Sequence, residues 1–490
     1  MAVESLENRP VRRVGTKPLD ALVIGSGPNG LASAITLARS GLSVRIIEGQ
    51  DVIGGGLRSA ELTLPGYMHD ICATILPLSR VSPFFRSLPL HEYGLVWIEP
   101  DIPLAHPFDD GTAAILYRSI PQTAATLGRD AYAYEQLMGP LVKNQEVLLA
   151  EILRPLHLPR HPLLLADFAR YGLRSAKGLA QAVFITDKAR GFFAGLSSHA
   201  MMPLEKTATA AFGLILAMLG HAVGWPIVQG GSQRLAGAMQ RYFMDLGGDI
   251  ITGHSVTSLE DIPDTRALLF DLTPRQIINL ASHRFPQSYR RQLQQYRYGP
   301  GVFKIDWALR EPIPWRAAAC RKAGTIHLGG MFEEIAASER AVSLGRHPDQ
   351  PYTIVAQQSL FDSSRAPAGR QTAWAYCHVP HGSTIDMTGR IEAQVERFAP
   401  GFCELIQARH TLSAVDMEQH NPNYVGGDIN GGVQDLRQLF VRPAMRLVPY
   451  STPDAQIFIC SSATPPGGGV HGLCGLYAAE AVLKSLFKLF

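Results

Sequence analysis

A glycine-rich turn near the start of the chain has the spacing of a dinucleotide-binding site. Gly25-Ser26-Gly27-Pro28-Asn29-Gly30 satisfies GxGxxG and lies between an apolar run, 20–24, and a helical stretch. Its three glycines permit a tight turn, close approach of a pyrophosphate, and close packing of helix on strand. Glu48 ends the next strand-like run, where a carboxylate accepts hydrogen bonds from ribose hydroxyls. We therefore expect a dinucleotide at the helix N-terminus, held by Gly25, Gly27, Pro28, Asn29, Gly30 and Glu48.

A second glycine cluster favours FAD over a nicotinamide nucleotide. Gly54-Gly55-Gly56 follows Glu48 closely and lets the backbone approach an extended cofactor. The first motif alone does not separate FAD from NAD, but no second GxGxxG turn directly follows a strand-like run. We expect a single long cofactor, FAD, with Gly54, Gly55 and Gly56 at its site.

Three histidines are candidates for moving a proton. His471 comes first, because it lies in a glycine loop near the C-terminus, although a structural hydrogen bond within that loop explains it equally well. His69 beside Asp70, and His199, are weaker candidates that packing or capping explains better. We name His471 as the candidate catalytic residue. No metal-binding constellation is present in the sequence.

Composition narrows the class of protein. The chain has 490 residues, 46% of them hydrophobic and 18% charged, and a net charge of +3. These values allow a large buried core and indicate no nucleic-acid partner. The six cysteines lack zinc or disulfide spacing, and covalent flavin attachment at Cys460 or Cys474 is less expected than two buried thiols. With no signal-peptide pattern before Asp20, we expect a cytoplasmic protein.

One apolar stretch raises the question of a membrane span. No residue from Thr207 to Gln233 is charged, but Gly213, Gly220 and Pro226 interrupt the stretch. A buried helix that ends near Gly220 is therefore the favoured interpretation. Peripheral contact with a membrane through the basic, apolar stretch 153–177 is left open, with a solvated face as the simpler explanation.

Local patterns place the remaining elements. Residues 130–222 have helical spacing broken by prolines, which predicts several helices. Short strand-like runs at 302–309, 325–328, 352–357 and 372–379 predict an antiparallel sheet. A strand at 456–460, a glycine loop and a helix at 473–487 repeat at the end of the chain the order seen at its beginning.

The chain resembles, over nearly its whole length, the phytoene desaturase and carotenoid isomerase group of FAD-dependent oxidoreductases, within the amine-oxidase-like flavoprotein superfamily. Besides the turn at 25–30 with Glu48, the resemblance rests on residues 53–55, 226–236, 247–250 and 465–475. It implies that Val256 meets the adenine and that residues 271–274 return the chain to the FAD domain. It also implies that Gly468, Gly469, Val470 and His471 reach the flavin and pyrophosphate, unless their loop only caps the last helix.

The resemblance implies an α/β fold in several pieces. We expect an FAD-binding Rossmann-like domain of the glutathione-reductase type, discontinuous in sequence, from residues 19–75, 225–290 and 445–490. An α+β substrate domain would combine an antiparallel sheet, 291–444, with a helical cover, 76–224, after a disordered lead, 1–18. One departure is that Gly56-Leu57 replaces the arginine that commonly follows the glycine pair, with Arg58 as the nearest positive charge at the cofactor. A carotenoid substrate is therefore not implied.

The expected activity is oxidoreduction at carbon-carbon bonds of a small lipophilic substrate, isoprenoids included, by desaturation, saturation or double-bond isomerisation. The electron acceptor is open between oxygen, a quinone and none. Amine or alcohol oxidation in the same architecture is one alternative, and would call for an aromatic pair framing the flavin. A non-catalytic protein stabilised by bound FAD is the other.

Overall fold

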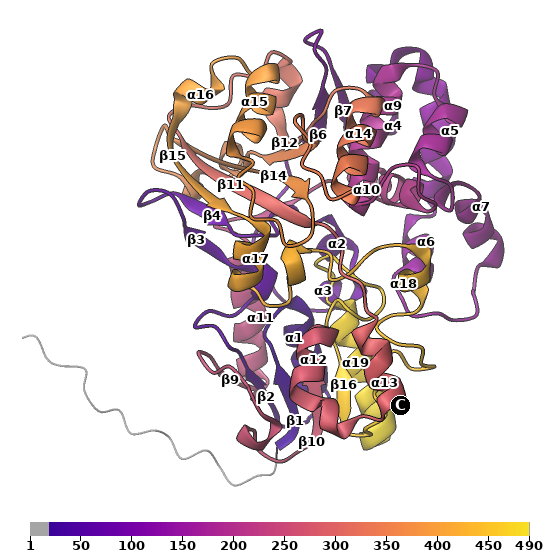
Figure 1. Ribbon diagram of the computed structural model, residues 1–490, viewed down its shortest axis with the longest axis vertical. Helices are drawn as coiled ribbons and strands as arrows, with labels where there is room; N and C mark the ends of the chain where they lie inside the picture. The colour runs from indigo at the N-terminus through magenta and orange to yellow at the C-terminus, as the bar shows by residue number, and fades with distance from the viewer. Residues whose placement is uncertain (1–18, 490) are drawn as a thin grey trace, which may run out of the picture.

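A computed structural model describes residues 19–489, so the predicted lead, 1–18, lies outside the described part. Two lobes share the chain (Figure 1). The lower lobe in this view holds a parallel sheet with helices on both sides, and the upper lobe holds a larger sheet beside a group of helices. The mixed α/β class expected from the sequence is confirmed.

The parallel sheet has five strands drawn from three distant parts of the chain. In spatial order they are β16 (Ile457–Ile459), β10 (Thr265–Phe270), β1 (Leu19–Ile24), β2 (Val44–Ile47) and β9 (Asp249–Ile251). Along β1, Ala21 and Val23 enter one core while Leu22 and Ile24 enter another, because successive strand side chains point to opposite faces. Both faces are therefore buried, as parallel sheets require.

Helices cover both faces of this sheet. The helix after the glycine turn, α1 (Pro28–Arg39), packs against α11 (Gln233–Asp245) and the C-terminal α19 (Leu473–Val482). The opposite face is covered by α12 (Pro274–Ala281) and α13 (Gln287–Gln294). The first and last segments of the chain thus meet in one core beside the glycine turn.

The upper sheet has seven strands. In spatial order they are β15 (Ile406–Leu412), β11 (Gly301–Leu309), β14 (Gln371–Val379), β13 (Thr353–Ala356), β12 (Ala323–Leu328), β6 (Ile102–Pro107) and β7 (Ala113–Leu116). The runs predicted as strands between 302 and 379 all form. The expectation of an antiparallel sheet is wrong at one place, since β6 pairs with β12 in parallel. Two strands of this sheet also come from the segment expected to be helical. They were not predicted, because prolines at both ends of β6 argue locally against a strand.

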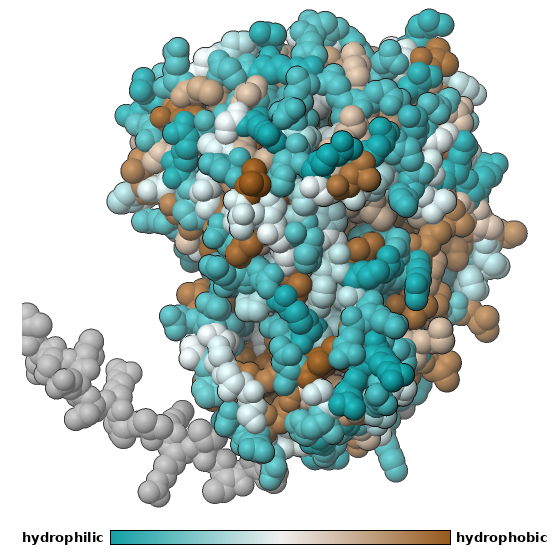
Figure 2. Space-filling model, in the orientation of Figure 1, coloured by the Kyte–Doolittle hydropathy of each residue, from teal (hydrophilic) through white to brown (hydrophobic). Residues whose placement is uncertain are grey.

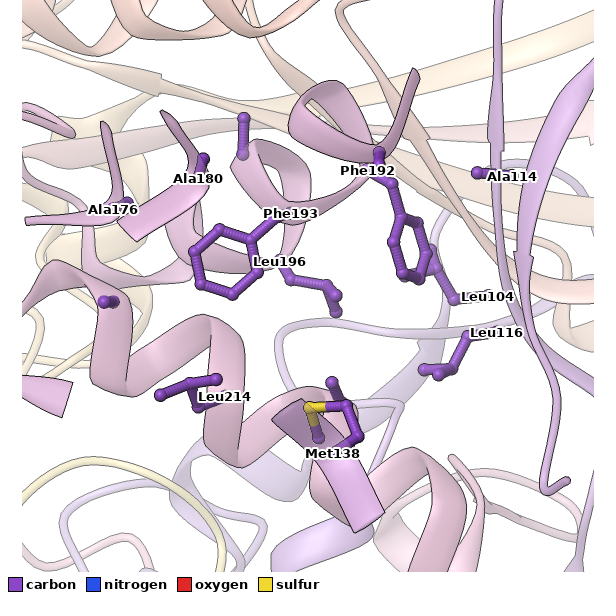
Figure 3. Close-up of a cluster of buried hydrophobic side chains, with 14 of the residues drawn as sticks. Leu104, Ala114, Leu116, Met138, Ala176, Ala180, Phe192, Phe193, Leu196 and Leu214 are labelled. Carbon is purple, nitrogen blue, oxygen red and sulfur yellow. The ribbon is translucent and has the colours of Figure 1, made fainter. Parts of the chain in front are cut away.

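A group of helices covers one side of this sheet. They are α4 (Ile120–Thr126), α5 (Ala131–Lys143), α6 (Gln145–Ile152), α7 (Pro162–Gly172), α8 (Ala176–Val183), α9 (Asp187–Ser197) and α10 (Thr209–Val223). Figure 3 shows their shared core, in which Phe192, Phe193 and Leu196 of α9 lie near Leu214 of α10 and Met138 of α5. Sheet residues such as Leu104 and Leu116 reach the same core, so cover and sheet are one packed unit.

The uncharged stretch forms α10, whose buried side chains agree with the predicted buried helix. The helix ends at Val223, not near Gly220, because Gly224 takes the left-handed φ of 72° that ends it. A Cβ on Gly220 would lie 2.4 Å from Leu116, so this glycine serves close packing. None of the helices in the described part of the chain is long and apolar enough to cross a membrane.

Short elements complete the structure. They are β3 (Ser59–Glu61), β4 (Met68–Asp70), β5 (Trp97–Ile98), β8 (Ile227–Val228), α2 (Pro77–Val81), α3 (Pro83–Arg86), α14 (Phe332–Ser343), α15 (Thr388–Phe398), α16 (Phe402–Leu405), α17 (Ala414–His420) and α18 (Leu436–Phe440).

Candidate functional site

One cavity of about 670 Å³ is lined both by the glycine turn of the lower lobe and by strands of the upper sheet. Most of the predicted cofactor residues line it. They are Gly25, Gly27, Pro28, Asn29, Glu48, Gly55, Gly56, Arg58, Val256, Gly468, Gly469 and Val470. Gly30, Gly54 and His471 do not line it. The structure thus brings three distant segments to one site, while their contacts to a cofactor stay predictions.

The glycine turn has the geometry that the motif predicts at two positions. Gly25 has φ of +100°, a conformation that favours glycine. A Cβ on Gly30 would lie 2.2 Å from the carbonyl oxygen of Gly25, so helix and strand could not pack this closely around a side chain. At Gly27 a Cβ would lie 2.6 Å from Oδ2 of Asp271. This glycine therefore leaves room for the carboxylate of Asp271, in addition to any room that it leaves for a pyrophosphate.

Asp271 is a buried carboxylate at the end of β10 that the sequence did not single out. Its Oδ2 accepts a hydrogen bond of 3.0 Å from the backbone N–H of Gly30, in the first turn of α1. Burial, opposed by this hydrogen bond and assisted by the nearby Glu48, raises the pKa of Asp271 to about 7. The only local signal was an acidic residue directly after the apolar run of β10. A carboxyl that is easily protonated here lowers the negative charge close to where phosphates are expected.

Glu48 lies at the end of β2 and is tied to the turn. Its Oε2 accepts hydrogen bonds from the backbone N–H of Ser26 at 2.8 Å and from Ser26 Oγ at 2.5 Å. Its Oε1 accepts one from the backbone N–H of Gln50 at 2.9 Å. Oε2 thus accepts two hydrogen bonds and Oε1 only one, so Oε1 has a further lone pair that can accept from a ribose hydroxyl.

The surroundings of Gly56 explain why this chain has no arginine directly after the glycine pair. A Cβ on Gly56 would lie 2.3 Å from the hydroxyl of Tyr424, which occupies the space that a side chain there would need. Arg58 is buried at the cavity wall, with Nε donating to Gly55 O at 3.0 Å and a terminal nitrogen to His420 O at 2.9 Å. The positive charge is therefore displaced by two residues and fixed by backbone carbonyls, and a tyrosine takes the vacated place.

The C-terminal glycine loop reaches the cavity, but its histidine turns away. Gly468, Gly469 and Val470 line the cavity. The ring of His471 is buried behind them, and its Nδ1 accepts a hydrogen bond of 3.0 Å from the backbone N–H of Leu473. Burial lowers the pKa of His471 to about 4, so the ring is neutral at pH 7. The alternative structural hydrogen bond is thus present, the buried Nε2 has no hydrogen-bond partner among the described residues, and the catalytic role of His471 stays a prediction.

A fully buried arginine, also missed in the sequence, holds the loop in place. The guanidinium of Arg442 donates to the carbonyl oxygens of Gly431 at 2.8 Å, Ser462 at 2.7 Å and Ala463 at 3.3 Å. It also lies 2.9 Å from the hydroxyl of Tyr296. One side chain thus joins the strand-loop-helix of the C-terminus to the chain before it.

The end of the cavity beneath the upper sheet is apolar and aromatic. Trp374 and Tyr376 project from one face of β14 and stack on each other, with ring centroids 5.8 Å apart and an interplanar angle of 16°. Leu216 of α10, Trp225 and Ile354 line the same region. Among the described residues that line the cavity, Asp, Glu, Lys and Arg occur only as Glu48, Arg58 and Asp271. The carboxyl groups and the guanidinium that line the cavity therefore belong to the dinucleotide end.

His199 is the titratable group at the aromatic end. Its Nε2 lies 3.0 Å from Nε2 of His327, a buried residue of β12, so the two rings share one hydrogen bond. Burial, and secondly the nearby His378, lower the pKa of His199 to about 3, while burial holds the pKa of His327 well below its usual value. Both rings are neutral at pH 7. The partner came from a distant strand, which is why sequence spacing gave His199 little weight.

His69, the other weaker candidate, is buried away from the cavity lining. Its Nε2 lies 2.9 Å from Thr63 Oγ1, and its Nδ1 lies 3.5 Å from Asp306. Asp70 pairs with the buried Arg365 at 2.9 Å. These contacts are structural. Within residues 19–489, no group of three or more His, Cys, Asp or Glu side chains is placed to hold a metal ion, and the six cysteines are free thiols.

The residues present fit an FAD molecule. The turn, the carboxylate of Glu48 and the C-terminal glycine loop are the donor and acceptor groups that a dinucleotide needs. The buried Oδ1 of Asn29, which lines the cavity at the start of α1, has no hydrogen-bond partner among the described residues. An extended cofactor could run from this turn to the aromatic end.

Comparisons with known proteins agree with this geometry. Residues 23–88 match the family described as NAD(P)-binding Rossmann-like domain. The chain is 25% identical to pyridine nucleotide-disulfide oxidoreductase domain-containing protein 2 of Mus musculus, covering 95% of this chain and 94% of that protein. It is also 25% identical to a protein of Castellaniella defragrans that is named as one of the subunits of limonene dehydrogenase, covering 96% of this chain and 95% of that protein.

A solved structure of putrescine oxidase bound to putrescine superposes with a TM-score of 0.60 at 18% identity, covering 95% of this chain and 99% of that one. At this identity the likeness concerns the fold. Residues 23–88 are therefore similar to a Rossmann-like NAD(P)-binding domain, and the chain as a whole has a fold like that of putrescine oxidase.

Proposed function

We propose that the protein is an FAD-dependent oxidoreductase that acts on a carbon-carbon bond of a lipophilic substrate, isoprenoids included. The reaction would be desaturation, saturation or double-bond isomerisation. The observation that carries the proposal is the division of the cavity, whose carboxyl and guanidinium groups lie at the dinucleotide end while Trp225, Ile354, Trp374 and Leu216 line the other. A relative named for limonene dehydrogenation supports a small isoprenoid hydrocarbon as the substrate class.

Bound FAD would supply a hydride acceptor, and the protein would supply position and a proton acceptor. The apolar walls exclude water and hold the reacting carbon. His199 is placed to receive the proton, because it lines the aromatic end of the cavity and its ring is unprotonated at pH 7.

The first test uses anaerobic reduction of the flavin. The purified holoprotein is mixed with lipid extracted from its own preparation and with cyclic and acyclic isoprenoids, and loss of the flavin absorbance is followed with and without a quinone. Reduction by a hydrocarbon, or its isomerisation seen by mass-resolved chromatography, is expected. A flavin that only primary amines or alcohols reduce would overturn the proposal, and one that nothing reduces would favour a binding role.

A variant separates chemistry from binding. Replacing His199 by glutamine should slow flavin reduction by the active hydrocarbon about 10²-fold or more while flavin content stays normal. His91→Gln is the matched control, because His91 is exposed and far from the cavity lining. Equal rates in wild type and His199→Gln would remove His199 from the reaction.

Amine oxidation is the second candidate, and the stacked Trp374 and Tyr376 favour it. An aromatic pair beside the flavin is the feature expected for that reaction. Against it, the described residues at the aromatic end of the cavity include no carboxylate to pair with an ammonium group. The same reduction assay decides between the two.

A further inference from the structure

Apolar side chains project into solvent from two loops on the outside of the helical cover. The first loop joins α6 to α7 and contains Leu158, which is 92% exposed, while Leu163 in the first turn of α7 is 86% exposed. The second loop follows α18, and there Met445 is 76% exposed and Leu447 fully exposed. Monomeric proteins seldom gather such side chains without a use for them. We call the set the apolar rim: Leu156, Leu158, Leu163, Phe440, Met445 and Leu447.

The two loops meet at one place. The hydroxyl of Tyr477 in α19 donates to Leu153 O at 3.3 Å, where the first loop begins. The ring of Tyr477 lies 6.2 Å from that of Tyr450, where the second loop ends. Figure 2 shows brown residues gathered along the right-hand edge, over α6 and the chain that leads into α7. The two loops that carry the rim are therefore anchored at the same side chain of α19.

The first loop is built to present its leucines. The carboxylate of Glu151 is buried and lies 2.7 Å from His157 Nε2 and 3.1 Å from His161 Nδ1. It also accepts hydrogen bonds from the backbone N–H groups of Arg160 at 3.0 Å and His161 at 3.1 Å. Four contacts to one carboxylate fix the conformation of the loop. The exposure of Leu158 and Leu163 therefore results from an ordered backbone.

The charge around the rim is positive. Residues 153–174 contain four arginines, Arg154, Arg160, Arg170 and Arg174, and one acidic residue, Asp167. In the second loop, residues 437–448 contain no acidic residue, and Arg437 and Arg446 are exposed. Leucines among guanidinium groups are typical of surfaces that lie in the headgroup region of anionic bilayers.

We propose that the apolar rim is a docking surface for an anionic phospholipid membrane. Its side chains protrude, which suits insertion between lipid headgroups, whereas a protein partner would need a matching pocket for each of them. The rim also lies on the cover of the cavity, because α7 packs on α10 and Leu216 of α10 lines the aromatic end. A membrane at the rim would place the source of a lipophilic substrate next to the chamber that takes it. The surface stands independently of the reaction in the cavity.

Vesicle sedimentation of the full-length holoprotein tests the proposal. We expect binding to vesicles of phosphatidylcholine mixed with an equal amount of phosphatidylglycerol, weak binding to phosphatidylcholine alone, and loss of binding in high salt. Leu158→Glu and Leu163→Glu should each weaken partition about tenfold or more, since each removes the transfer of a leucine side chain from water. Leu344→Glu is the matched control, because Leu344 is 59% exposed at the end of α14 and outside the rim.

Two outcomes would overturn the docking surface. One is that the rim is not needed for binding, which would show as no binding to anionic vesicles or as a loss of vesicle binding in Leu344→Glu equal to that in the rim variants. The other is a dimer in light scattering that Leu158→Glu converts to monomer without any effect on vesicle binding, which would assign the rim to a second copy of the chain. Flavin content and thermal midpoint, measured on every variant, exclude misfolding as the cause of lost binding.

Discussion

Asp271 and Gly27 determine together, at the scale of single residues, how the dinucleotide turn is built. The carboxylate lies within the space that a Cβ on Gly27 would need, and it also binds the N–H of Gly30. The requirement for glycine at position 27 is usually explained by the ligand on one side of the turn. Here the carboxylate of Asp271 on the other side is a second, steric cause. The first prediction and its double variant separate the two causes, and the second prediction concerns the charge of Asp271.

The first prediction concerns Gly27→Ala. Gly27 has φ of −63°, which alanine adopts without strain, so the added methyl group acts only through space. It would lie 2.6 Å from Asp271 Oδ2, and we expect the variant to lose most of its flavin while it remains folded. The ratio of flavin to protein absorbance measures this. Gly139→Ala in α5, where a Cβ meets nothing within 4 Å, is the control.

The double variant Gly27→Ala with Asp271→Ala assigns the cause. If the clash with the carboxylate empties the site, removing the carboxylate should restore flavin content. Continued loss of flavin in the double variant would show that the methyl group blocks the pyrophosphate itself.

The second prediction follows from the pKa of Asp271, which rises from 3.8 to about 7 on folding. Because the folded state binds the proton more tightly, the contribution of this group to stability is largest below about pH 4 and is lost as the pH rises through 7. The loss amounts to roughly 4 kcal/mol. Asp271→Asn keeps an oxygen for the N–H of Gly30 and removes the charge.

We therefore expect Asp271→Asn to raise the denaturant midpoint of the flavin-free protein at pH 8 and to change it little at pH 4. Unfolding followed by circular dichroism at both pH values provides the comparison. A variant less stable than wild type at pH 8 would mean that the ionised carboxylate stabilises the turn.

At the scale of elements, the sequence predicted what local patterns encode. Strand, glycine turn and helix at residues 19–39 were readable, because each feature lies within a few residues of the next. The same holds for the strand-like runs of the upper sheet. Pairing between distant segments was not readable, so the parallel contact of β6 with β12 and the hydrogen bond of His199 to His327 went unpredicted.

The C-terminal loop shows the same limit for the candidate site. Gly468 and Gly469 line the cavity that the turn also lines, while their contact with a flavin or pyrophosphate stays a prediction. The direction of His471 was not predictable, because a ring can bond to its own loop or face a ligand with the same sequence. Tyr424, whose hydroxyl fills the space at Gly56, is not among the residues expected at the cofactor.

The third prediction concerns Arg442, which holds the C-terminal loop in place through hydrogen bonds to carbonyl groups. Arg442→Met keeps much of the side-chain volume but leaves the carbonyl groups of Gly431, Ser462 and Ala463 without their charged donor. We expect a loss of about 3 kcal/mol or more in unfolding free energy, since buried groups left unpaired are costly. Faster release of flavin should accompany it, because the loop lines the cavity.

Thermal midpoint and flavin release on dilution are the measurements for Arg442→Met. Arg437→Met is the control, as Arg437 is exposed in neighbouring α18. A variant that melts like wild type would show that water replaces the guanidinium at these carbonyls.

At the scale of the whole molecule, the two lobes are joined by a buried ion network. Arg365 lies 2.9 Å from Asp70 in β4 and 2.9 Å from Asp362. Asp362 in turn accepts a hydrogen bond of 2.7 Å from the backbone N–H of Gly230, before α11 of the lower lobe. Movement of one lobe against the other would break a fully buried charge pair, which is costly. The cavity walls are therefore held at a fixed separation.

The last prediction concerns removal of FAD. The parallel sheet takes strands from three distant segments, and all three contribute residues to the cavity, so a bound dinucleotide would cross-link them in the folded state alone. Ligand at 100 times its dissociation constant then adds about 2.7 kcal/mol to stability. We expect the thermal midpoint of flavin-free protein to rise with each addition of FAD, and AMP alone to give a smaller rise. If NAD raised the midpoint and FAD did not, the assignment of FAD to this cavity would be wrong, because the site would then hold a nicotinamide dinucleotide instead of a flavin.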